Sequence, residues 1–309
     1  MQAVDALIAM RLQSQVALVS QVSHYIVAAG GKRMRPVILL LMSRALGVES
    51  EQRINLAAVV EFIHTATLLH DDVVDESELR RGRATANNAF GNAASVLVGD
   101  FLYSRAFQMM VSSNNVRIMQ VLADATNIIA EGEVMQLMNV HDAQLTVAQY
   151  LQVIRSKTAK LFEASSRLAA VLAGSNAATE EACAQYGNAV GTAFQIIDDV
   201  LDYDGTVDSI GKNVGDDLRE GKATLPLIFA MQLTAPEDAS IIRHAIETGG
   251  LDQLARISAL VKSSGALQKA RALAQAEAEL AQQALAILPE SEFKTALLQL
   301  AADASARLA

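Results

Sequence analysis

The sequence predicts an all-α protein, and three properties of its 309 residues point to that fold class. Proline, which breaks helices, occurs only 4 times. Alanine and leucine, which favour helices, are abundant, while runs that alternate apolar and polar residues with period two are rare. Apolar residues make up 51% of the chain, enough for a sizeable core. No linker rich in proline or serine and no solenoid repeat divides the sequence, so we expect one domain over residues 1–309.

The expected helices follow one another along the chain, separated by glycine or polar turns. The long ones span residues 4–28, 36–46, 51–75, 93–111, 116–138, 147–173 and 180–203. The shorter ones span residues 223–232, 237–247, 250–263, 266–286 and 291–307. Together they predict a bundle of about ten or more helices.

Local residues set these boundaries. Gly30-Gly31 ends the first helix, and Pro36 suits the first position of the second. Later turns lie at Ser112–Asn115, Gly174–Asn176 and Gly249-Gly250. Two longer irregular stretches remain, residues 76–92 and 204–222. Loops of that length in a compact helical protein are usually functional or disordered.

Composition and charge exclude several classes of function. The net charge of −9 argues against a general affinity for nucleic acid or anionic membranes. The single cysteine, Cys183, cannot form an intrachain disulfide or a cysteine-based metal site. The N-terminus carries Asp5 and lacks the apolar region of a signal peptide, and the longest strongly apolar run, Val37–Met42, is too short to cross a bilayer. We therefore expect a soluble, cytoplasmic protein with no nucleic-acid partner.

Two aspartate clusters with identical spacing are the outstanding feature of the chain. They consist of Asp71, Asp72 and Asp75, and of Asp198, Asp199 and Asp202. Residues i and i+4 share a helix face, so these carboxylates repel one another, and they lie at helix ends where negative charge is disfavoured. Solvated acidic helix ends are the simple alternative. The repeated spacing instead favours Mg²⁺, which binds carboxylate, water and phosphate oxygens, so two facing clusters could hold a diphosphate through bridging ions.

The chain also carries cations that could bind a diphosphate. Lys32, Arg33 and Arg35 stand in a glycine turn at the expected start of a helix, where anions bind. Arg80 and Arg81 directly follow the first cluster. Taken alone, the first group could be an exposed basic turn, and the second could simply offset the charge of the aspartates.

Three lysines and one histidine extend this set. Lys157 lies in a largely apolar helix, which favours a polar pocket over a surface position. Lys212 and Lys222 belong to the glycine-punctuated loop after the second cluster, where a mobile lid would be reasonable. His64 precedes Asp71 by two helical turns on the same face, although a structural role is an equal alternative.

The helix faces below the two clusters carry mostly small residues. Below Asp71 lie Thr67, Val60 and Ala57, and below Asp198 lie Phe194, Gly191 and Gly187. Glycine is costly inside a helix, so the two glycines indicate that something approaches this face closely. The favoured interpretation is another helix, and the alternative is a substrate chain. A long, narrow, apolar shaft below a diphosphate site would suit a hydrocarbon chain attached to that diphosphate.

The motifs resemble those of a known enzyme family. The segments GGKRMRP, LLHDDVVDESELRRG and FQIIDDVLDY match the basic turn and the two aspartate-rich motifs of trans-isoprenyl diphosphate synthases, and the chain resembles this family over almost its full length. The stretch around the first motif looks most like the branch that makes octaprenyl diphosphate for bacterial quinones. The resemblance implies the all-α isoprenoid-synthase fold, a bundle around a deep central cavity.

The resemblance also implies roles for individual residues. Asp71, Asp72 and Asp75 would hold Mg²⁺ on the allylic diphosphate, and Asp198 would bind a third ion. Asp199 and Asp202 of the second motif are also expected among the metal-binding residues. Contacts to the allylic diphosphate would come from Arg80, Lys157, Lys212 and Lys222, with Gln195 and Thr158 as further polar positions. Contacts to isopentenyl diphosphate would come from Lys32, Arg35, His64 and Arg81. The residues expected to be catalytic are Asp71, Asp72, Asp75, Arg80, Lys157, Asp198 and Lys212.

The implied reaction is repeated chain elongation. The allylic C–O bond ionises, isopentenyl diphosphate attacks the carbocation in a dry pocket, and the released diphosphate removes a proton. In this family the residues four and five before the first aspartate limit the chain in short-chain enzymes. Here they are the small Thr67 and Ala66, which fits a long product made from farnesyl diphosphate. Ala66 is included on the resemblance alone. The deeper floor is expected from Met119, Leu122 or Met135.

Several alternatives stay open at this point. A synthase of shorter or longer chains would share all these motifs. An HD-type phosphohydrolase would use His64, His70 and Asp71 but leaves the second cluster unexplained. A regulatory subunit of a heteromeric synthase typically lacks motif aspartates, and a class I terpene cyclase would not need the basic turn. The resemblance also implies a homodimer and a brief membrane contact during product release.

Overall fold

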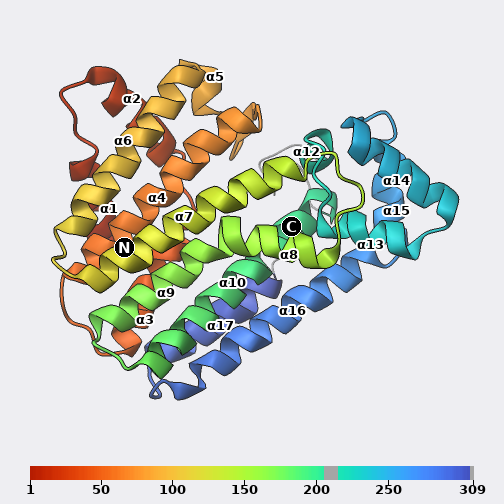
Figure 1. Ribbon diagram of the computed structural model, residues 1–309. Coiled ribbons are helices and arrows are strands. Elements are labelled where there is room, and N and C mark those ends of the chain that lie inside the picture. Colours follow the sequence, from red (N-terminus) through yellow and green to blue (C-terminus); the bar gives the residue numbers. More distant parts are fainter. Residues whose placement is uncertain (205–214, 307–309) are drawn as a thin grey trace. The chain divides into compact units, whose positions relative to one another are not determined.

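The structure is a computed structural model that describes residues 1–204 and 215–306 (Figure 1). Nearly all of its regular structure is helical, so the predicted all-α class is confirmed. The chain divides into two compact units, which are described separately. Unit 1 comprises Met1–Thr126, Leu161–Gly187 and Leu285–Leu297, and unit 2 comprises Asn127–Lys160, Asn188–Ala284 and Leu298–Ala309. The single domain expected from the sequence stays a prediction.

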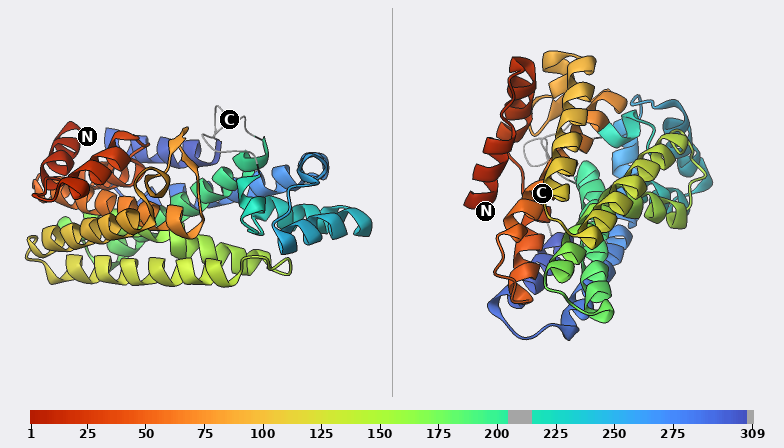
Figure 2. Two further views of the ribbon diagram at one scale, coloured as in Figure 1. Left: turned by 90° about the horizontal axis from the view of Figure 1, so that it is seen from above. Right: turned by 60° about the vertical axis from the view of Figure 1, so that its left-hand side comes forward.

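Unit 1 is organised around one long buried helix. Its elements are α1 (Gln2–Arg11), α2 (Ala17–Ala28), α3 (Met34–Ala45), α4 (Gln52–Val74), β1 (Leu79–Arg80), β2 (Arg83–Ala84), α5 (Ala86–Phe90), α6 (Asn92–Val111), η2 (Leu285–Ile287) and parts of α7 (Val116–Met138), α9 (Lys160–Leu172), α10 (Ala177–Asp204) and α17 (Glu292–Ala306). Helix α4 packs against α1, α3 and α6, and it lies alongside α6 in Figures 1 and 2. Every residue from Leu56 to Ile63 is buried, so α4 forms the core that carries the first aspartate cluster at its end.

Unit 2 is built from shorter helices. Besides its parts of α7, α9, α10 and α17, it contains α8 (Val147–Ile154), η1 (Arg155–Ala159), α12 (Asp216–Arg219), α13 (Leu225–Leu233), α14 (Pro236–Thr248), α15 (Leu254–Ser263) and α16 (Ala266–Ala284). The almost wholly apolar α13 packs against α8, α14, α15 and α16. Thr146 caps α8 with a capping box, in which its hydroxyl accepts from the Gln149 N–H and the Gln149 side chain accepts from the Thr146 N–H.

The expected helix over residues 4–28 is wrong, because the chain breaks it into α1 and α2. Between them the Ser14 hydroxyl accepts the Val16 N–H at 3.1 Å, and the Ser20 hydroxyl donates to the Ser14 carbonyl at 3.3 Å. Serine side chains that bond the backbone in this way compete with helical hydrogen bonds. Apolar periodicity alone did not reveal the break.

Two other segments differ from the structure that the sequence predicted. The stretch 76–92 contains the hairpin β1–β2 and the short helix α5. The hairpin turns at Arg81 and Gly82, which both have positive φ, 54° and 71°, as a two-residue type I′ turn requires. Within the expected helix 147–173, residues Arg155–Ala159 form the π-helical turn η1.

The favoured interpretation of Gly187, close helix packing, is confirmed. A Cβ at this position would lie 2.3 Å from the carbonyl oxygen of Phe162, so only glycine lets α10 approach α9 here. Among the residues that the structure describes, no helix is both long and apolar enough to traverse a bilayer.

The single cysteine offers a test of packing in unit 1. Cys183 is 1% exposed and lies 3.6 Å from the sulfur of Met42, and burial raises the pKa of its thiol to about 12. Since the thiolate is the reactive form, the native protein should react with Ellman's reagent far more slowly than the unfolded chain in urea does. Cys183→Ala supplies the blank, and rapid labelling of the native protein would contradict the burial.

Candidate active site

The first aspartate cluster stands at the C-terminal end of α4 in unit 1. Asp71 and Asp72 belong to the last turn, and Asp75 caps the helix with its N–H on the Asp71 carbonyl at 2.8 Å. The three carboxylates are not equivalent, because Asp72 is fully buried while Asp71 and Asp75 are partly exposed. Solvent therefore reaches only the first and third members of this cluster.

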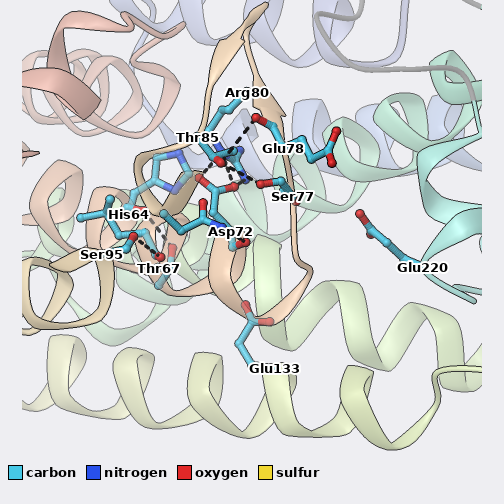
Figure 3. A network of polar contacts seen from close by, with 12 residues as sticks. His64, Thr67, Asp72, Ser77, Glu78, Arg80, Thr85, Ser95, Glu133 and Glu220 are labelled. Carbon is cyan, nitrogen blue, oxygen red and sulfur yellow. Dashed lines mark hydrogen bonds and ion pairs between the residues drawn. The ribbon is translucent and has the colours of Figure 1, made fainter. Parts of the chain in front are cut away.

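Asp72 is bound by Arg80 from the adjacent hairpin (Figure 3). The Arg80 Nε donates to both carboxylate oxygens at 2.9 and 3.1 Å, and Nη2 donates to Oδ1 at 2.7 Å. Removing one partner of such a buried pair typically costs about 3–5 kcal/mol, because the other charge stays buried. Arg80, which follows the first cluster in the sequence, is thus in direct contact with that cluster.

Further hydrogen bonds fasten this hairpin to the end of α4. The Thr85 hydroxyl donates to the Ser77 carbonyl at 2.7 Å, and the Asn87 amide donates to the Asp72 carbonyl at 3.2 Å. The Ser77 N–H donates to the same Asp72 carbonyl at 3.0 Å. These bonds fix the hairpin that carries Arg80 and Arg81 relative to the end of α4.

The basic turn before α3 is anchored by one of its own cations. Arg33, in a left-handed conformation with φ 49°, pairs with the buried Glu61 on α4. Arg35 lies 4.3 Å above the ring of Phe162, which leaves Lys32 as the exposed cation of the turn. Arg33, which the sequence grouped with the other two, thus has a structural contact of its own.

Arg81 lies directly against this turn. A Cβ at Gly31 would come within 2.8 Å of the Arg81 guanidinium, so the arginine side chain lies close against the backbone of the turn. The structure thereby brings together Arg81 and the glycine turn, two predicted parts of a diphosphate site that are far apart in the sequence.

His64 lies among the arginines of unit 1. Burial lowers the pKa of its imidazole well below the usual value, and the charges of Arg35, Arg80, Arg81 and Arg33 lower it further. His64 is therefore neutral near pH 7. Thr67, one turn further along α4, donates its hydroxyl to the His64 carbonyl at 2.8 Å (Figure 3). Its neighbour Ala66 is fully buried.

The second aspartate cluster lies on α10 in unit 2. Asp198 is partly exposed, whereas Asp199 and Asp202 are each 4% exposed. The hydroxyl of Tyr150 donates to Asp199 Oδ2 at 2.6 Å, and the amide of Gln195 donates to Oδ1 at 2.8 Å. Burial raises the pKa of the Asp199 carboxyl well above its usual range, and the charge of Asp217 raises it further.

Lys157 stands on the π-helical turn η1, in contact with α7. Its Nζ lies 2.6 Å from a carboxylate oxygen of Glu133. A Cβ at Gly132 would lie 2.6 Å from the Lys157 backbone nitrogen, so this glycine lets the turn approach α7. The interpretation of Lys157 as a lysine in a polar pocket agrees with its side chain, which is only 18% exposed.

The same part of α7 joins Lys157 to Lys222. With its amide oxygen turned toward them, Gln136 accepts from Lys157 Nζ at 3.2 Å and from Lys222 Nζ at 3.3 Å. Lys222 Nζ also lies 2.6 Å from Glu220. Two of the cations predicted for the allylic diphosphate therefore meet in unit 2. The third lysine of that set, Lys212, lies outside the described residues.

Five residues near these groups were missed by the sequence analysis: Glu61, Glu133, Gln136, Tyr150 and Asp217. Glu61 had a visible signal, since it is a lone acid in an otherwise apolar stretch of α4. The others depend on contacts between segments distant in sequence. In the described part of the chain, no three histidine, cysteine, aspartate or glutamate side chains converge closely enough to hold an ion by themselves.

Comparisons with known proteins agree with this assembly of motifs. Residues 16–263 match the model of the family described as polyprenyl synthetase. The chain is 52% identical over 302 residues to an octaprenyl diphosphate synthase of Escherichia coli (strain K12), covering 97% of this chain and 94% of the relative. It is 50% identical to an all-trans-nonaprenyl-diphosphate synthase (geranyl-diphosphate specific) of Rhodobacter capsulatus, covering 96% and 92%.

A solved structure extends the likeness to the fold. The polyprenyl synthase from Caulobacter crescentus CB15, complexed with calcium and isoprenyl diphosphate, superposes with a TM-score of 0.97 at 47% identity, covering 100% of this chain and 95% of that one. The chain therefore belongs to the polyprenyl synthetase family and is a prenyltransferase with the all-α isoprenoid-synthase fold.

Proposed function

We propose that the protein is a Mg²⁺-dependent synthase that condenses isopentenyl diphosphate repeatedly with an allylic diphosphate. The starter is farnesyl diphosphate and the product is all-trans octaprenyl diphosphate, a precursor of quinone side chains. The observation that carries the proposal is that each unit holds an aspartate cluster linked to a cation. In unit 1 Arg80 binds Asp72 directly, and in unit 2 hydrogen bonds lead from Asp199 through Gln195 to Thr158, the neighbour of Lys157. The octaprenyl relative supports the product, and the nonaprenyl relative favours a product longer by one isoprene unit as the second candidate.

The partly exposed carboxylates of Asp71, Asp75 and Asp198 are proposed to hold the ions. Hard oxygen donors of this kind suit Mg²⁺, which takes its remaining ligands from water and phosphate. The bound ions would neutralise the departing diphosphate. Asp72 is proposed to act by holding Arg80, and Asp202 by shaping the second cluster from its buried position.

Arg80, Lys157 and Lys222 are proposed to bind the allylic diphosphate, together with Lys212 and the polar Gln195 and Thr158. Their charges act most strongly on the diphosphate as it departs, when negative charge builds up on its oxygens. Lys157 and Lys222 both contact Gln136, which supports the proposal that both lysines bind the same diphosphate.

Lys32, Arg35, Arg81 and His64 are proposed to bind isopentenyl diphosphate. The arginines supply charge, and the neutral imidazole of His64 donates one N–H without adding to the repulsion among them. Apolar residues around the substrates exclude water from the carbocation. The released diphosphate accepts the proton that completes each addition.

The remaining expectations stand as parts of this proposal. Thr67 and Ala66 allow the chain to pass deeper, toward a floor from Met119, Leu122 or Met135. The enzyme works as a homodimer in the cytoplasm and contacts a membrane briefly to release its product. All six motif aspartates are present, which favours an active synthase over a regulatory subunit.

The direct test incubates purified protein with Mg²⁺, farnesyl diphosphate and labelled isopentenyl diphosphate, and sizes the product by chromatography. We expect octaprenyl diphosphate. Asp71→Ala should lower turnover by about a hundredfold or more while the thermal midpoint changes little, because a lost metal ligand affects the reaction and not the core. Absence of elongation with farnesyl, geranyl and geranylgeranyl diphosphate alike would refute the proposal.

Product length tests the apolar shaft. Thr67→Tyr should shorten the main product, because a bulky ring one turn below Asp71 blocks the growing chain. Thr67→Ser is the matched control and should leave the product unchanged. If Thr67→Tyr also leaves the product length unchanged, the shaft does not pass this residue.

The pKa of His64 predicts a pH dependence of stability. The folded protein disfavours the proton on His64, whereas the unfolded chain accepts it below the ordinary pKa of about 6.5. Stability is therefore lost as the pH falls, by at most about 1.4 kcal/mol per pH unit from this group. Urea unfolding at pH 7 and pH 5.5 should show a smaller loss in His64→Gln than in the natural sequence, and equal losses would contradict the assignment.

A further inference from the structure

Tyr150 lies at one end of a chain of hydrogen bonds that links three elements of unit 2. Its hydroxyl donates to Asp199 Oδ2 at 2.6 Å, Gln195 Nε2 donates to Asp199 Oδ1 at 2.8 Å, and the hydroxyl of Thr158 donates to Gln195 Oε1 at 3.0 Å. Tyr150 stands on α8, Thr158 on η1, and the other two on α10. The chain thus connects the second aspartate cluster to the turn that carries Lys157.

Asp199 is the centre of this chain and is enclosed by protein. Only 4% of it is exposed, and each carboxylate oxygen already accepts a short hydrogen bond from a side chain. At this exposure little of the carboxylate is open to a hydrated metal ion. The neighbouring Asp198 is partly exposed and lies about 100° around the helix from Asp199. The two adjacent aspartates therefore differ in what they can contact.

The burial of Asp199 explains why the donors are needed. At 4% exposure the carboxylate is costly, and the like charges of Asp217 and Asp198 add to that cost. A buried carboxylate that loses one donor bears the cost of an unmade hydrogen bond, and it turns toward another partner. Asp198 and Asp199 are consecutive residues of α10. A rearrangement of the Asp199 side chain therefore shifts the stretch of helix that also carries Asp198, a proposed metal ligand.

We propose that Tyr150 is a positioning residue of this enzyme, which acts through Asp199 to hold Asp198 and, through Gln195 and Thr158, the turn of Lys157 in the arrangement that binds the allylic diphosphate and its metal. The proposal rests on the proposed function and refines it. Asp199, expected from the sequence to be a metal ligand, becomes an internal hydrogen-bond acceptor.

The first test is Tyr150→Phe, which removes one hydroxyl and keeps the ring. We expect kcat/KM for farnesyl diphosphate to fall about tenfold or more, and the Mg²⁺ concentration for half-maximal activity to rise. KM for isopentenyl diphosphate should stay the same, because its proposed ligands stand on other elements. Unchanged kinetics and Mg²⁺ dependence would overturn the proposal.

Tyr186→Phe is the matched control. Tyr186 is also a buried tyrosine, its hydroxyl donates to the Leu297 carbonyl at 2.9 Å in unit 1, and neither residue belongs to a predicted motif. It should lower the thermal midpoint without changing kcat, either KM or the Mg²⁺ dependence. If both variants change the kinetics alike and only in proportion to lost stability, Tyr150 is merely structural and the proposal fails.

A second pair of variants separates an internal acceptor from a metal ligand. Asp199→Asn keeps an oxygen for the Tyr150 hydroxyl, and its amide can donate to Gln195 once that side chain turns over. It should keep at least about tenfold more activity than Asp198→Asn, which loses a proposed metal ligand. Equal losses with equal shifts in Mg²⁺ dependence would make Asp199 a ligand. If the protein with the natural sequence makes no polyprenyl product, the proposed function itself is refuted.

Discussion

Repulsion between adjacent carboxylates is the constraint on which the site depends. Each cluster places like charges together at the unfavourable end of a helix dipole. The fold gives the middle aspartate of each cluster an internal partner: Arg80 binds Asp72 in unit 1, and Tyr150 with Gln195 binds Asp199 in unit 2. The first aspartate of each cluster keeps access to solvent. In each cluster, one carboxylate is bound inside the protein while the preceding one stays open to solvent.

The cations are held in the same manner, through residues that do not themselves need to meet substrate. Arg33 ties the basic turn to the buried Glu61, and the close approach of Arg81 to Gly31 links that turn to the hairpin. In unit 2, Gln136 joins Lys157 to Lys222. A strongly charged site is thus built on pairs whose geometry is fixed before any ligand arrives, which reduces the cost of ordering it.

Much of this could be predicted from the sequence, for reasons visible in particular residues. Helices such as α7 follow from apolar periodicity between polar turns, and the clusters follow from the spacing of Asp71 and Asp198 with their neighbours. What could not be predicted depends on partners distant in sequence. Spacing gave no sign that Asp199 binds Tyr150, and the break after α1 depends on hydrogen bonds of Ser14 that compete weakly with the helix.

The π-helical turn η1 has a consequence for how such a site can evolve. A π turn amounts to one extra residue within an α-helix, and each residue rotates the helix by about 100°. A single-codon insertion at Arg155–Ala159 would have turned Lys157 and Thr158 to a new face while leaving the apolar pattern on either side intact. Gly132 on α7 supplies the space that this wider turn requires. An ancestral helix without the insertion would present different side chains at this point, so the turn marks where a new binding surface could arise without redesign of the core.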